Sequence, residues 1–394
     1  MQIQDEFNVL QETSTESQIR ESVRKITDSL GAGYIDRCLK TDTPPQELWD
    51  ELSKAGYLGI GISTEYGGGG LGLYGLFCVA EELAYKESLL VMLVMSSGIV
   101  APILEKWGTD YQKDKYLRRM ATGEIKFSFA ITEQDSGSNL YNMKTALKRN
   151  TESNSYSLNG SKCYISGVND ADYILVVARV KQDDGTLTKP VLCIVDAKDT
   201  KVQKTVIDMP HFSADKQWQL FFDNVDISED HIVGGLDNGL SAVFCGLNPE
   251  RILMAAYCNG IAMNAIERAS KYACERIVWK KPIGAHQGIS HPLAKAKINL
   301  EQARLMTRKA AFLHGSIPEN EVAEYANYAK YASAEAAIQA VDTAIQVHGG
   351  NGFTDAYGIA KLYWPARLFR TAPVSAEMIL NYVSQNILNL PRSY

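Results

Sequence analysis

The sequence has no cysteine arrangement that could support a disulfide framework. Seven cysteines are scattered over 394 residues, and no two of them form a C-x-x-C pair. An odd, dispersed set fits a reducing compartment, in which cysteine acts as a small hydrophobic side chain. We therefore expect all seven thiols to be small buried hydrophobic groups.

Signatures of hydrolases, metalloenzymes and dinucleotide-binding folds are also missing. The chain contains no G-x-S-x-G and no cysteine with an obvious partner base. Its six histidines show no metal-ligand spacing, and His286 and His291 do not share a helix face. Gly67, Gly69 and Gly72 match G-x-G-x-x-G, but no βαβ alternation surrounds them, so a turn before a helix is the better interpretation.

Charge is low and evenly spread. The formal net charge is −6, and no basic block indicates a nucleic-acid partner. The apolar run SLLVMLVMSSGIVAPIL is interrupted by Ser96, Ser97 and Pro102, which favours a buried helix over a membrane span. The opening MQIQDEFNVLQE carries acids and no apolar run, unlike a signal peptide. We expect a cytoplasmic protein that binds neither nucleic acid nor membranes.

Hydrophobic periodicity predicts an α+β protein: a helical domain over 1–127, a β-barrel-like domain over 128–235 and a helical bundle over 236–394. The middle segment consists of short β-branched and aromatic runs, and Asn159-Gly160 and Asp184-Gly185 are hairpin signals. Four long helices with short links are expected in the bundle. Their predicted ranges are roughly 248–276, 288–315, 320–348 and 374–390.

Three segments carry groups suited to a flat, phosphate-bearing ligand. In AITEQDSGSN, a strand runs through Thr132 into a turn that exposes N–H groups and hydroxyls, although an Asx or Ser turn would satisfy itself. In KCYISG, Tyr164 and Ser166 fall on one side of a strand, as an ordinary cross-strand tyrosine also would. In AIQVHGGNGF, Gly349 and Gly350 end a helix, either as a C-cap or for close approach to a ligand.

Taken in this order, these segments resemble the acyl-CoA dehydrogenase family over nearly the whole chain. The resemblance includes the TE…SGS turn, NGSKCYISG, the ER that opens a bundle helix, CERIVWKKPIGAHQGISHPLAKAKINLE and AIQVHGGNGFTDAYGIAKLYWPARLFR. It implies a helical domain, a small β domain and a four-helix bundle that enclose FAD and an acyl-CoA thioester. It also implies a homo-oligomer, usually a tetramer, with FAD held across a subunit interface.

The resemblance also implies a set of site residues. Those expected to bind FAD are Phe129, Ile131, Thr132, Ser138, Tyr164, Ser166, Arg276, Trp279, His286, Gln287, Gln346, Gly349, Gly350, Ser375 and Glu377. Ser138, Asn248 and Arg251 are expected near the acyl-CoA.

The main departure from the family concerns the catalytic base. Many members carry it in a Glu-Gly-Thr run, where this chain has Pro373, which offers no carboxylate. A subset that includes isovaleryl-CoA and long-chain acyl-CoA dehydrogenases places the base before an arginine on a bundle helix. Glu250 in NPERILMA matches that position. Milder departures are Lys280, where a glycine is usual, and Asn139, where an aspartate is common.

Glu250 also admits a purely structural interpretation. Asn248 is a good N-cap, Pro249 suits the first helical position, and an acid at the next position favours the helix dipole by about 0.3–1 kcal/mol. Proton abstraction α to a thioester instead needs a carboxylate in an apolar cavity that raises its pKa toward neutrality. Because apolar residues follow Glu250, we favour the base role, with Glu377 as the next candidate and Arg251 as an anchor for CoA.

The expected activity is FAD-dependent α,β-dehydrogenation of an acyl-CoA to the trans-2-enoyl-CoA, with electrons passed to an electron-transferring flavoprotein. Alternatives on the same fold are an acyl-carrier-protein-bound dehydrogenase, an enoyl-CoA reductase and a flavin oxidase or hydroxylase. A flavin-binding protein without dehydrogenase activity is the alternative from another class. Acyl chain length and branching stay open, because no spacing rule recovers the depth of a pocket.

Overall fold

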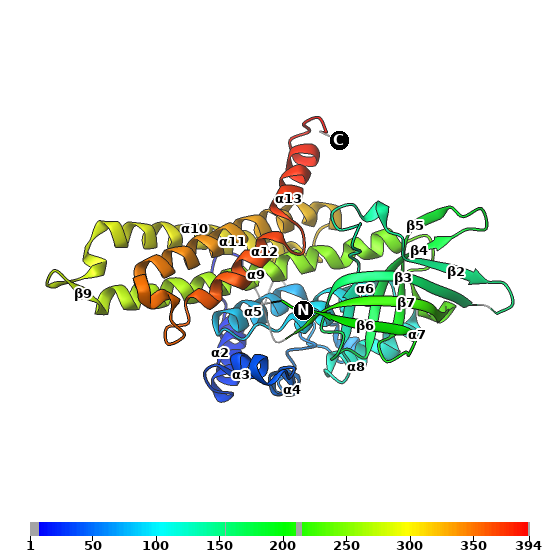
Figure 1. Ribbon diagram of the computed structural model, residues 1–394, viewed down its shortest axis with the longest axis horizontal. Helices are drawn as coiled ribbons and strands as arrows, with labels where there is room; N and C mark the ends of the chain where they lie inside the picture. The colour runs from blue at the N-terminus through cyan, green and yellow to red at the C-terminus, as the bar shows by residue number, and fades with distance from the viewer. Residues whose placement is uncertain (1–7, 154, 210–214, 393–394) are drawn as a thin grey trace. The chain divides into compact units, whose positions relative to one another are not determined.

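The computed structural model describes residues 8–153, 155–209 and 215–392, and the chain divides into two compact units (Figure 1). The helical unit comprises residues 1–35, 73–89 and 251–394, and the sheet unit comprises 36–72 and 90–250. Each unit is built from segments distant in sequence. The predicted boundaries at 127/128 and 235/236 stay a prediction.

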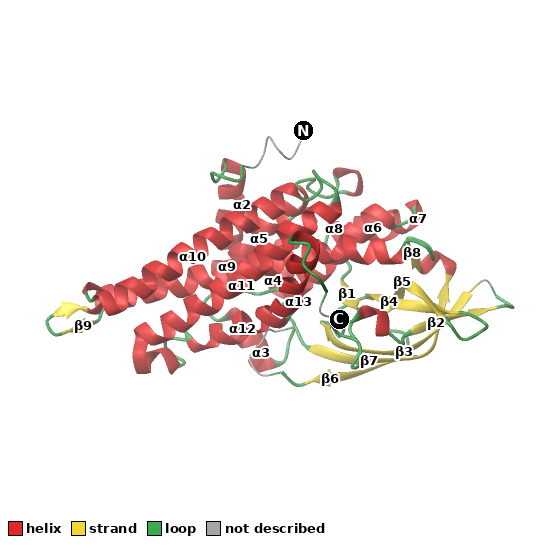
Figure 2. Cartoon of the chain, turned by 90° about the horizontal axis from the view of Figure 1, so that it is seen from above, coloured by secondary structure: helices red, strands yellow, loops and turns green. Residues whose placement is uncertain are grey.

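The helical unit has long C-terminal helices and two helices from the N-terminal third of the chain. Its helices are α2 (Ser14–Ser29), α5 (Gly72–Tyr85), most of α9 (Gly239–Glu275), α10 (Gln287–Leu313), α11 (Glu319–His348), α12 (Tyr363–Thr371) and α13 (Ala376–Tyr382). The strands β9 (Ile277–Val278) and β10 (Lys281–Pro282) form a hairpin between α9 and α10. Figure 2 shows this hairpin at the far end of the α9–α10 pair.

Small buried side chains let α10 and α11 pack closely along their length (Figures 1 and 2). Ala296, Leu300 and Ala303 on α10 are buried, each three or four residues from the next. This spacing gives one apolar stripe per helix, as the predicted helical periodicity requires. Ala329 and Ala336 on α11 are buried in the same way.

The sheet unit combines short helices with one eight-stranded sheet. Its principal helices are α3 (Tyr34–Thr41), α4 (Gln46–Lys54), η2 (Leu93–Val100), α6 (Ala101–Trp107), α7 (Asp110–Gln112), α8 (Arg118–Ala121) and the start of α9. Its strands are β1 (Phe127–Ala130), β2 (Ala146–Asn150), β3 (Ser155–Ser166), β4 (Tyr173–Lys181), β5 (Leu187–Asp196), β6 (Val202–Ile207), β7 (Gln217–Ser228) and β8 (Ile232–Val233).

The strand order is β6-β7-β3-β2-β4-β5-β8, and β1 joins as a parallel partner of β4. The predicted hairpin at Asp184-Gly185 is confirmed, since β4 and β5 pair antiparallel on either side of it. The hairpin predicted at Asn159-Gly160 is wrong, because both residues lie inside β3 at a shift in register against β7. A Cβ on Gly160 would lie 2.6 Å from the Thr145 backbone, so the glycine serves a close approach rather than a turn.

The run expected to be a buried helix is one, over residues 91–107, with π-helical hydrogen bonding in η2. Its side chains from Val91 to Ala101 are all buried. Six of the cysteines are buried as expected, but Cys274 is exposed, contrary to the prediction. Among the helices that the structure describes, none is both long enough and apolar enough to cross a membrane.

Helix α9 begins nine residues before the predicted N-cap. It starts at Gly239, so Asn248 and Pro249 lie inside it and the capping interpretation of Glu250 is wrong. Proline inside a helix removes one backbone hydrogen bond and favours a kink, so it is more common at a helix start. For that reason Asn248-Pro249 resembles a helix start in the sequence. Packing explains why α9 continues through the proline. Gly246 approaches the helix 91–107 so closely that a Cβ would lie 2.7 Å from Ile103 and 2.8 Å from Ile99.

Candidate active site

The segment that leaves β1 is fixed against β3 in the sheet unit. Phe129 is buried within β1, and Ile131 and Thr132 beyond it are half-buried. The carbonyl of Thr132 accepts a hydrogen bond from the N–H of Cys163 at 2.9 Å. Neither the N–H nor the hydroxyl of Thr132 has a hydrogen-bond partner among the described residues. Two donors are therefore available at the edge of the sheet.

Tyr164 and Ser166 follow on the same stretch of β3. A bulge between Lys162 and Ile165 interrupts the pairing with β7, and Tyr164 has a left-handed φ of 58°. The strict alternation that predicted Tyr164 and Ser166 on one side is therefore interrupted. The Tyr164 ring is 62% exposed, while the carbonyl of Ser166 accepts a hydrogen bond from the Ser128 hydroxyl at 2.8 Å. The structure thus brings the β1 end and this part of β3 together.

The turn after Thr132 closes on itself and leaves its tip open. Glu133 and Ser136 exchange backbone hydrogen bonds of 3.1 Å, and the Ser136 hydroxyl donates to the carbonyl of Asn139 at 2.6 Å. Asn139 in turn accepts from the N–H of Tyr141 at 3.1 Å, so its side chain caps a short helix. Ser138 is exposed, and its hydroxyl has no partner among the described residues.

In the helical unit, seven predicted residues gather at the ends of α9, α10 and α11. All of them are exposed: Arg276, Trp279, His286, Gln287, Gln346, Gly349 and Gly350. The end of α9 meets the end of α11, because the rings of Tyr272 and His348 stack with centroids 4.4 Å apart. The Tyr272 hydroxyl also accepts from the Asn351 amide at 3.0 Å. Burial lowers the pKa of His348, so the stacked imidazole is neutral at pH 7.

The β9–β10 hairpin turns at two residues with left-handed backbone. Trp279 has a φ of 54° and Lys280 a φ of 65°, and they link the paired residues Val278 and Lys281. Two positive φ values in a two-residue loop are the geometry of a type I′ turn, which favours glycine. This explains why a glycine would be usual at Lys280. The turn also leaves the Trp279 side chain 86% exposed.

Glu250 lies in the interior of α9 and is only 8% exposed. It follows Gly246 by one turn and so shares the helix face that packs on Ile99 and Ile103. The same helix 91–107 contacts β1, where the Ser96 hydroxyl accepts from the N–H of Phe127 at 3.2 Å. Within the sheet unit, one buried helix thus lies against both the α9 start and the strand leading to Thr132.

Asn248 and Arg251, expected near the acyl-CoA, flank this position on α9. Asn248 is 3% exposed and Arg251 is half-buried. Both residues lie within α9 rather than at its start, so Asn248 is not the N-cap of a helix.

The segment at Pro373 lies between α12 and α13 and carries no buried carboxylate. Lys330, 1% exposed on α11, donates to the carbonyl of Val374. The Ser375 hydroxyl caps α13 by accepting from the N–H of Met378 at 3.3 Å. Glu377 is exposed in the first turn of α13, and its own N–H and the Ser375 hydroxyl lower its pKa. An exposed carboxylate of lowered pKa is a poor general base.

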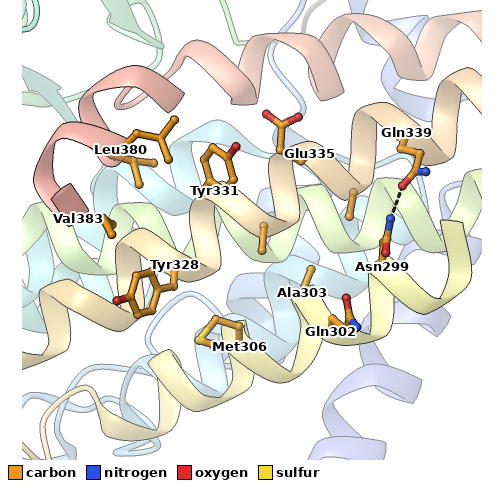
Figure 3. A pocket seen from close by; sticks show the side chains of 13 residues that line it. Asn299, Gln302, Ala303, Met306, Tyr328, Tyr331, Glu335, Gln339, Leu380 and Val383 are labelled. Atoms are coloured by element: carbon orange, nitrogen blue, oxygen red, sulfur yellow. Dashed lines mark hydrogen bonds between the residues drawn. The ribbon is translucent and has the colours of Figure 1, made fainter. Parts of the chain in front are cut away.

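A pocket of about 660 Å³ lies between α10, α11 and α13 (Figure 3). The Asn299 amide donates to the Gln339 side chain across it at 2.6 Å, and none of the predicted site residues lines it. Among the described residues, no group of three or more His, Cys, Asp or Glu side chains could hold a metal ion.

Sequence reasoning missed one buried charge at the site. Lys162 lies two residues before Tyr164, and its side chain has no exposed surface. A charged residue in the middle of a strand was the available signal. Glu133 is its partner, at 2.9 Å, so each of the two turns toward the inside of the sheet unit.

The chain has helical N-terminal, sheet middle and helical C-terminal parts, and comparison with known proteins places it in a class of flavoprotein oxidoreductases. Sequence models of the acyl-CoA dehydrogenase N-terminal, middle and C-terminal domains match residues 13–124, 128–225 and 237–388. The chain is 43% identical to the acyl-CoA dehydrogenase FadE12 of Mycobacterium tuberculosis, over 96% of this chain and 98% of that protein. The chain belongs to the acyl-CoA dehydrogenase family, whose members are oxidoreductases that act on a CH–CH group.

Two further likenesses extend over almost the whole chain. A 3-(aryl)acrylate reductase of Clostridium sporogenes is 30% identical over 94% of this chain and 97% of its own length. A solved structure of a glutaryl-coenzyme A dehydrogenase with glutaryl-CoA matches with a TM-score of 0.89 at 26% identity, covering 98% of each chain. The predicted family and fold class are therefore confirmed.

The family depends on FAD, and the residues of each unit fit that cofactor. In the sheet unit, Thr132 has free donors and its carbonyl is bonded to Cys163, the residue before the exposed Tyr164, which suits a flat, oxygen-rich ligand. Ser138, in the turn that follows Thr132, adds an exposed hydroxyl. In the helical unit, a Cβ on Gly349 or Gly350 would meet nothing within 4 Å, so the backbone there is open to a ligand.

Proposed function

We propose that the protein catalyses α,β-dehydrogenation of an acyl-CoA thioester to the trans-2-enoyl-CoA, with Glu250 as the base. The observation that carries this proposal is the burial of Glu250 inside α9, one turn from the contact of Gly246 with the helix 91–107. Because Glu250 lies inside α9 rather than at its first turn, a helix-capping role does not account for this position. The C-terminal alternative is weak, because Pro373 has no carboxylate and Glu377 is exposed.

The proposed reaction removes a hydride from the β-carbon and a proton from the α-carbon, and different groups at the site serve each step. FAD, which Thr132 and Tyr164 would help to hold, would supply the acceptor for the hydride of the substrate β-carbon. Glu250 takes the proton from the α-carbon, and backbone N–H donors near the thioester oxygen stabilise the negative charge that develops there. Thr132, Ser138 and Tyr164 orient the cofactor, and Arg251 anchors the CoA end of the substrate. Buried surroundings exclude water, which strengthens each of these interactions.

Replacing Glu250 by glutamine tests the base assignment. Glutamine keeps the size of the side chain but cannot accept the proton, so E250Q should bleach its flavin with acyl-CoA at least ~100-fold more slowly than the wild type. The measurement is anaerobic stopped-flow absorbance with a panel of acyl-CoAs. The same substitution in the exposed Glu275 at the end of α9 is the control, and E275Q should react at the wild-type rate. An E250Q rate equal to that of E275Q would remove Glu250 from the mechanism.

A second candidate is the reverse reaction, favoured by the likeness to the 3-(aryl)acrylate reductase. By microscopic reversibility Glu250 would then deliver the α-proton. This alternative predicts that no acyl-CoA bleaches the oxidised protein, while 2-enoyl thioesters rapidly reoxidise the chemically reduced protein. Measuring both half-reactions on one preparation separates the two directions.

The remaining parts of the proposal concern the partners, the location, the metabolic role and the domain organisation of the protein. The electrons pass to an electron-transferring flavoprotein, and the protein is a homo-oligomer, a tetramer in the form usual for the family. Its location is cytoplasmic, and its role lies in fatty acid metabolism. The domains end at residues 127, 235 and 394. The exposure of the seven FAD-binding candidates at the ends of α9, α10 and α11 supports the oligomer, since a second copy would cover them.

A further inference from the structure

A buried ion pair lies directly behind the residues that leave β1. The Lys162 ammonium is 2.9 Å from a Glu133 carboxylate oxygen, and it also donates to the carbonyl of Ile131 at 2.8 Å. The Lys162 side chain has no exposed surface and that of Glu133 is 7% exposed. Two charges in such a place cost desolvation energy, so the pair needs additional hydrogen bonds to persist.

The carboxylate supplies those bonds by joining a third segment. Its oxygens accept from the N–H of Lys144 at 2.7 Å and from the N–H of Thr145 at 3.0 Å. The Thr145 hydroxyl then donates to the carbonyl of Ser161 at 3.1 Å, next to Lys162 on β3. The Lys162–Glu133 pair thus ties together the end of β1, the segment before β2 and the middle of β3.

Both groups are charged at neutral pH. Burial lowers the pKa of Lys162 to about 8, although the carboxylate of Glu133 and the neighbouring thiols of Cys193 and Cys163 oppose this. Burial acts to raise the pKa of Glu133, but Lys162 and the hydrogen bonds at Thr145 and Lys144 outweigh it, so the pKa is lowered. The contact is therefore an ammonium–carboxylate pair rather than a neutral one.

We propose that the Lys162–Glu133 pair positions the flavin-facing edge of the sheet unit. The Lys162 ammonium holds the Ile131 carbonyl, and the next carbonyl, that of Thr132, is held by the Cys163 N–H at 2.9 Å. With both carbonyls turned toward β3, the N–H and hydroxyl of Thr132 are left to face a ligand. Neither Lys162 nor Glu133 touches the ligand in this role. The inference rests on the proposed FAD site.

The chain offers a matched control for this pair. Lys126, at the opposite end of β1, is likewise buried and contacts Asp170 at 2.5 Å and the Gln46 amide oxygen at 2.7 Å. It belongs to the same unit but holds none of residues 131–133. K126M and K162M each remove one buried ammonium and leave one carboxylate behind, so both should lower the unfolding temperature. Only K162M should disturb the Thr132 donors.

The experiment is a fluorescence titration of the apo-proteins with FAD, with the visible spectrum of the bound flavin. K162M should bind FAD about tenfold more weakly than the wild type, with a shifted spectrum, because the Thr132 donors lose their fixed direction. K126M should match the wild type in affinity and spectrum. If K162M fails to fold, the double variant K162M/E133Q carries no lone buried charge and should show the same loss of affinity.

Amide hydrogen exchange of the apo-proteins gives a second readout that needs no cofactor. The N–H of Cys163 should exchange faster in K162M and K162M/E133Q than in the wild type, and at an unchanged rate in K126M. Equal FAD affinity and equal Cys163 exchange in K162M and K126M would overturn the inference while leaving the proposed function in place. A wild-type protein that binds no FAD would overturn both the inference and the proposed function. If E250Q binds FAD but resists bleaching, loss of the catalytic base is distinguished from loss of the Lys162–Glu133 pair.

Discussion

At the scale of single residues, Asp215 shows how burial alone can make a side chain sensitive to pH. This residue is 4% exposed, and its carboxylate accepts a hydrogen bond from the N–H of Val91 at 2.8 Å. Burial raises the pKa of Asp215 to about 6, against the opposing hydrogen bond from Val91. The carboxyl thus anchors the start of the helix 91–107 and holds its proton more tightly than an exposed aspartate does.

This raised pKa predicts a slope in stability between about pH 4 and pH 6. The folded state binds its proton more tightly than the unfolded state, so the stabilisation is fully present below about pH 4 and is lost as the pH rises through 6. Each tenfold difference in proton affinity between the folded and unfolded states corresponds to about 1.4 kcal/mol. D215N keeps an acceptor for Val91 but cannot titrate, so its unfolding free energy should lack this slope. Urea titrations at several pH values check this, and parallel curves for both proteins would refute it.

At the scale of the secondary-structure elements, a network of buried charges joins α2, α5 and α10 within the helical unit. Glu81 on α5 lies 2.8 Å from Arg20 of α2 and 2.9 Å from Arg304 of α10. Glu16 of α2 contacts Arg308 of α10 at 2.9 Å. Burial acts to raise the pKa of Glu81, but Arg304 and Arg20 outweigh it and lower the pKa to about 2.

E81Q should therefore destabilise the protein by about 3–5 kcal/mol at pH 7, because it leaves buried arginines without their counter-charge. Since the pKa of Glu81 is depressed, this stabilisation is present above about pH 4.5 and is lost as the pH falls toward 2. The control is E21Q on α2, because Glu21 pairs with Lys25 in an exposed i,i+4 contact of 2.6 Å, and this substitution should change stability far less than E81Q does. Equal denaturation midpoints for the two variants would contradict the prediction.

The secondary-structure elements also show which parts of the fold could be predicted from the sequence. The helices at α4, α5, α10 and α11 and the hairpin at Asp184-Gly185 follow from local periodicity and turn chemistry, which act over a few residues. The start of α9 does not, because Asn248-Pro249 resembles a cap locally while Gly246 is held in helix by packing on Ile99 and Ile103. The bulge at Gly160 likewise depends on Thr145, a contact that no local pattern contains.

The candidate site likewise has one part that the sequence predicts and another that it does not. Its residue types could be taken from the family resemblance, which names positions such as Thr132 and Glu250. The buried ion pair that supports them could not be predicted, because Lys162 and Glu133 are far apart in sequence and meet where the segment after β1 lies against β3. The packing of α9 one turn before Glu250 also depends on the helix 91–107, more than a hundred residues away. Long-range contacts, rather than local propensity, therefore separate what was predictable from what was not.

At the scale of the whole molecule, one end of the helical unit exposes apolar surface that a single chain leaves uncovered. Trp279 is 86% exposed and Ile277 is 55% exposed on the β9–β10 hairpin. Arg276, Gln287 and the Gly349-Gly350 turn, all expected to bind FAD, are exposed as well. Aromatic side chains exposed beside polar groups are typical of interaction sites. We therefore expect this hairpin to be covered in the proposed homo-oligomer.

W279A should weaken both assembly and cofactor retention. Removing the large ring takes away apolar area from the proposed contact, so the variant should dissociate to smaller species at protein concentrations at which the wild type stays assembled. Light scattering after size-exclusion chromatography over a dilution series measures the mass, and absorbance gives the ratio of FAD to protein. L10A is the control, because Leu10 is 83% exposed but lies outside the expected cofactor residues. If the wild type and W279A share one mass and one FAD content at every dilution, the hairpin does not join subunits. FAD binding by the exposed residues of the helical unit would then have to occur within a single chain.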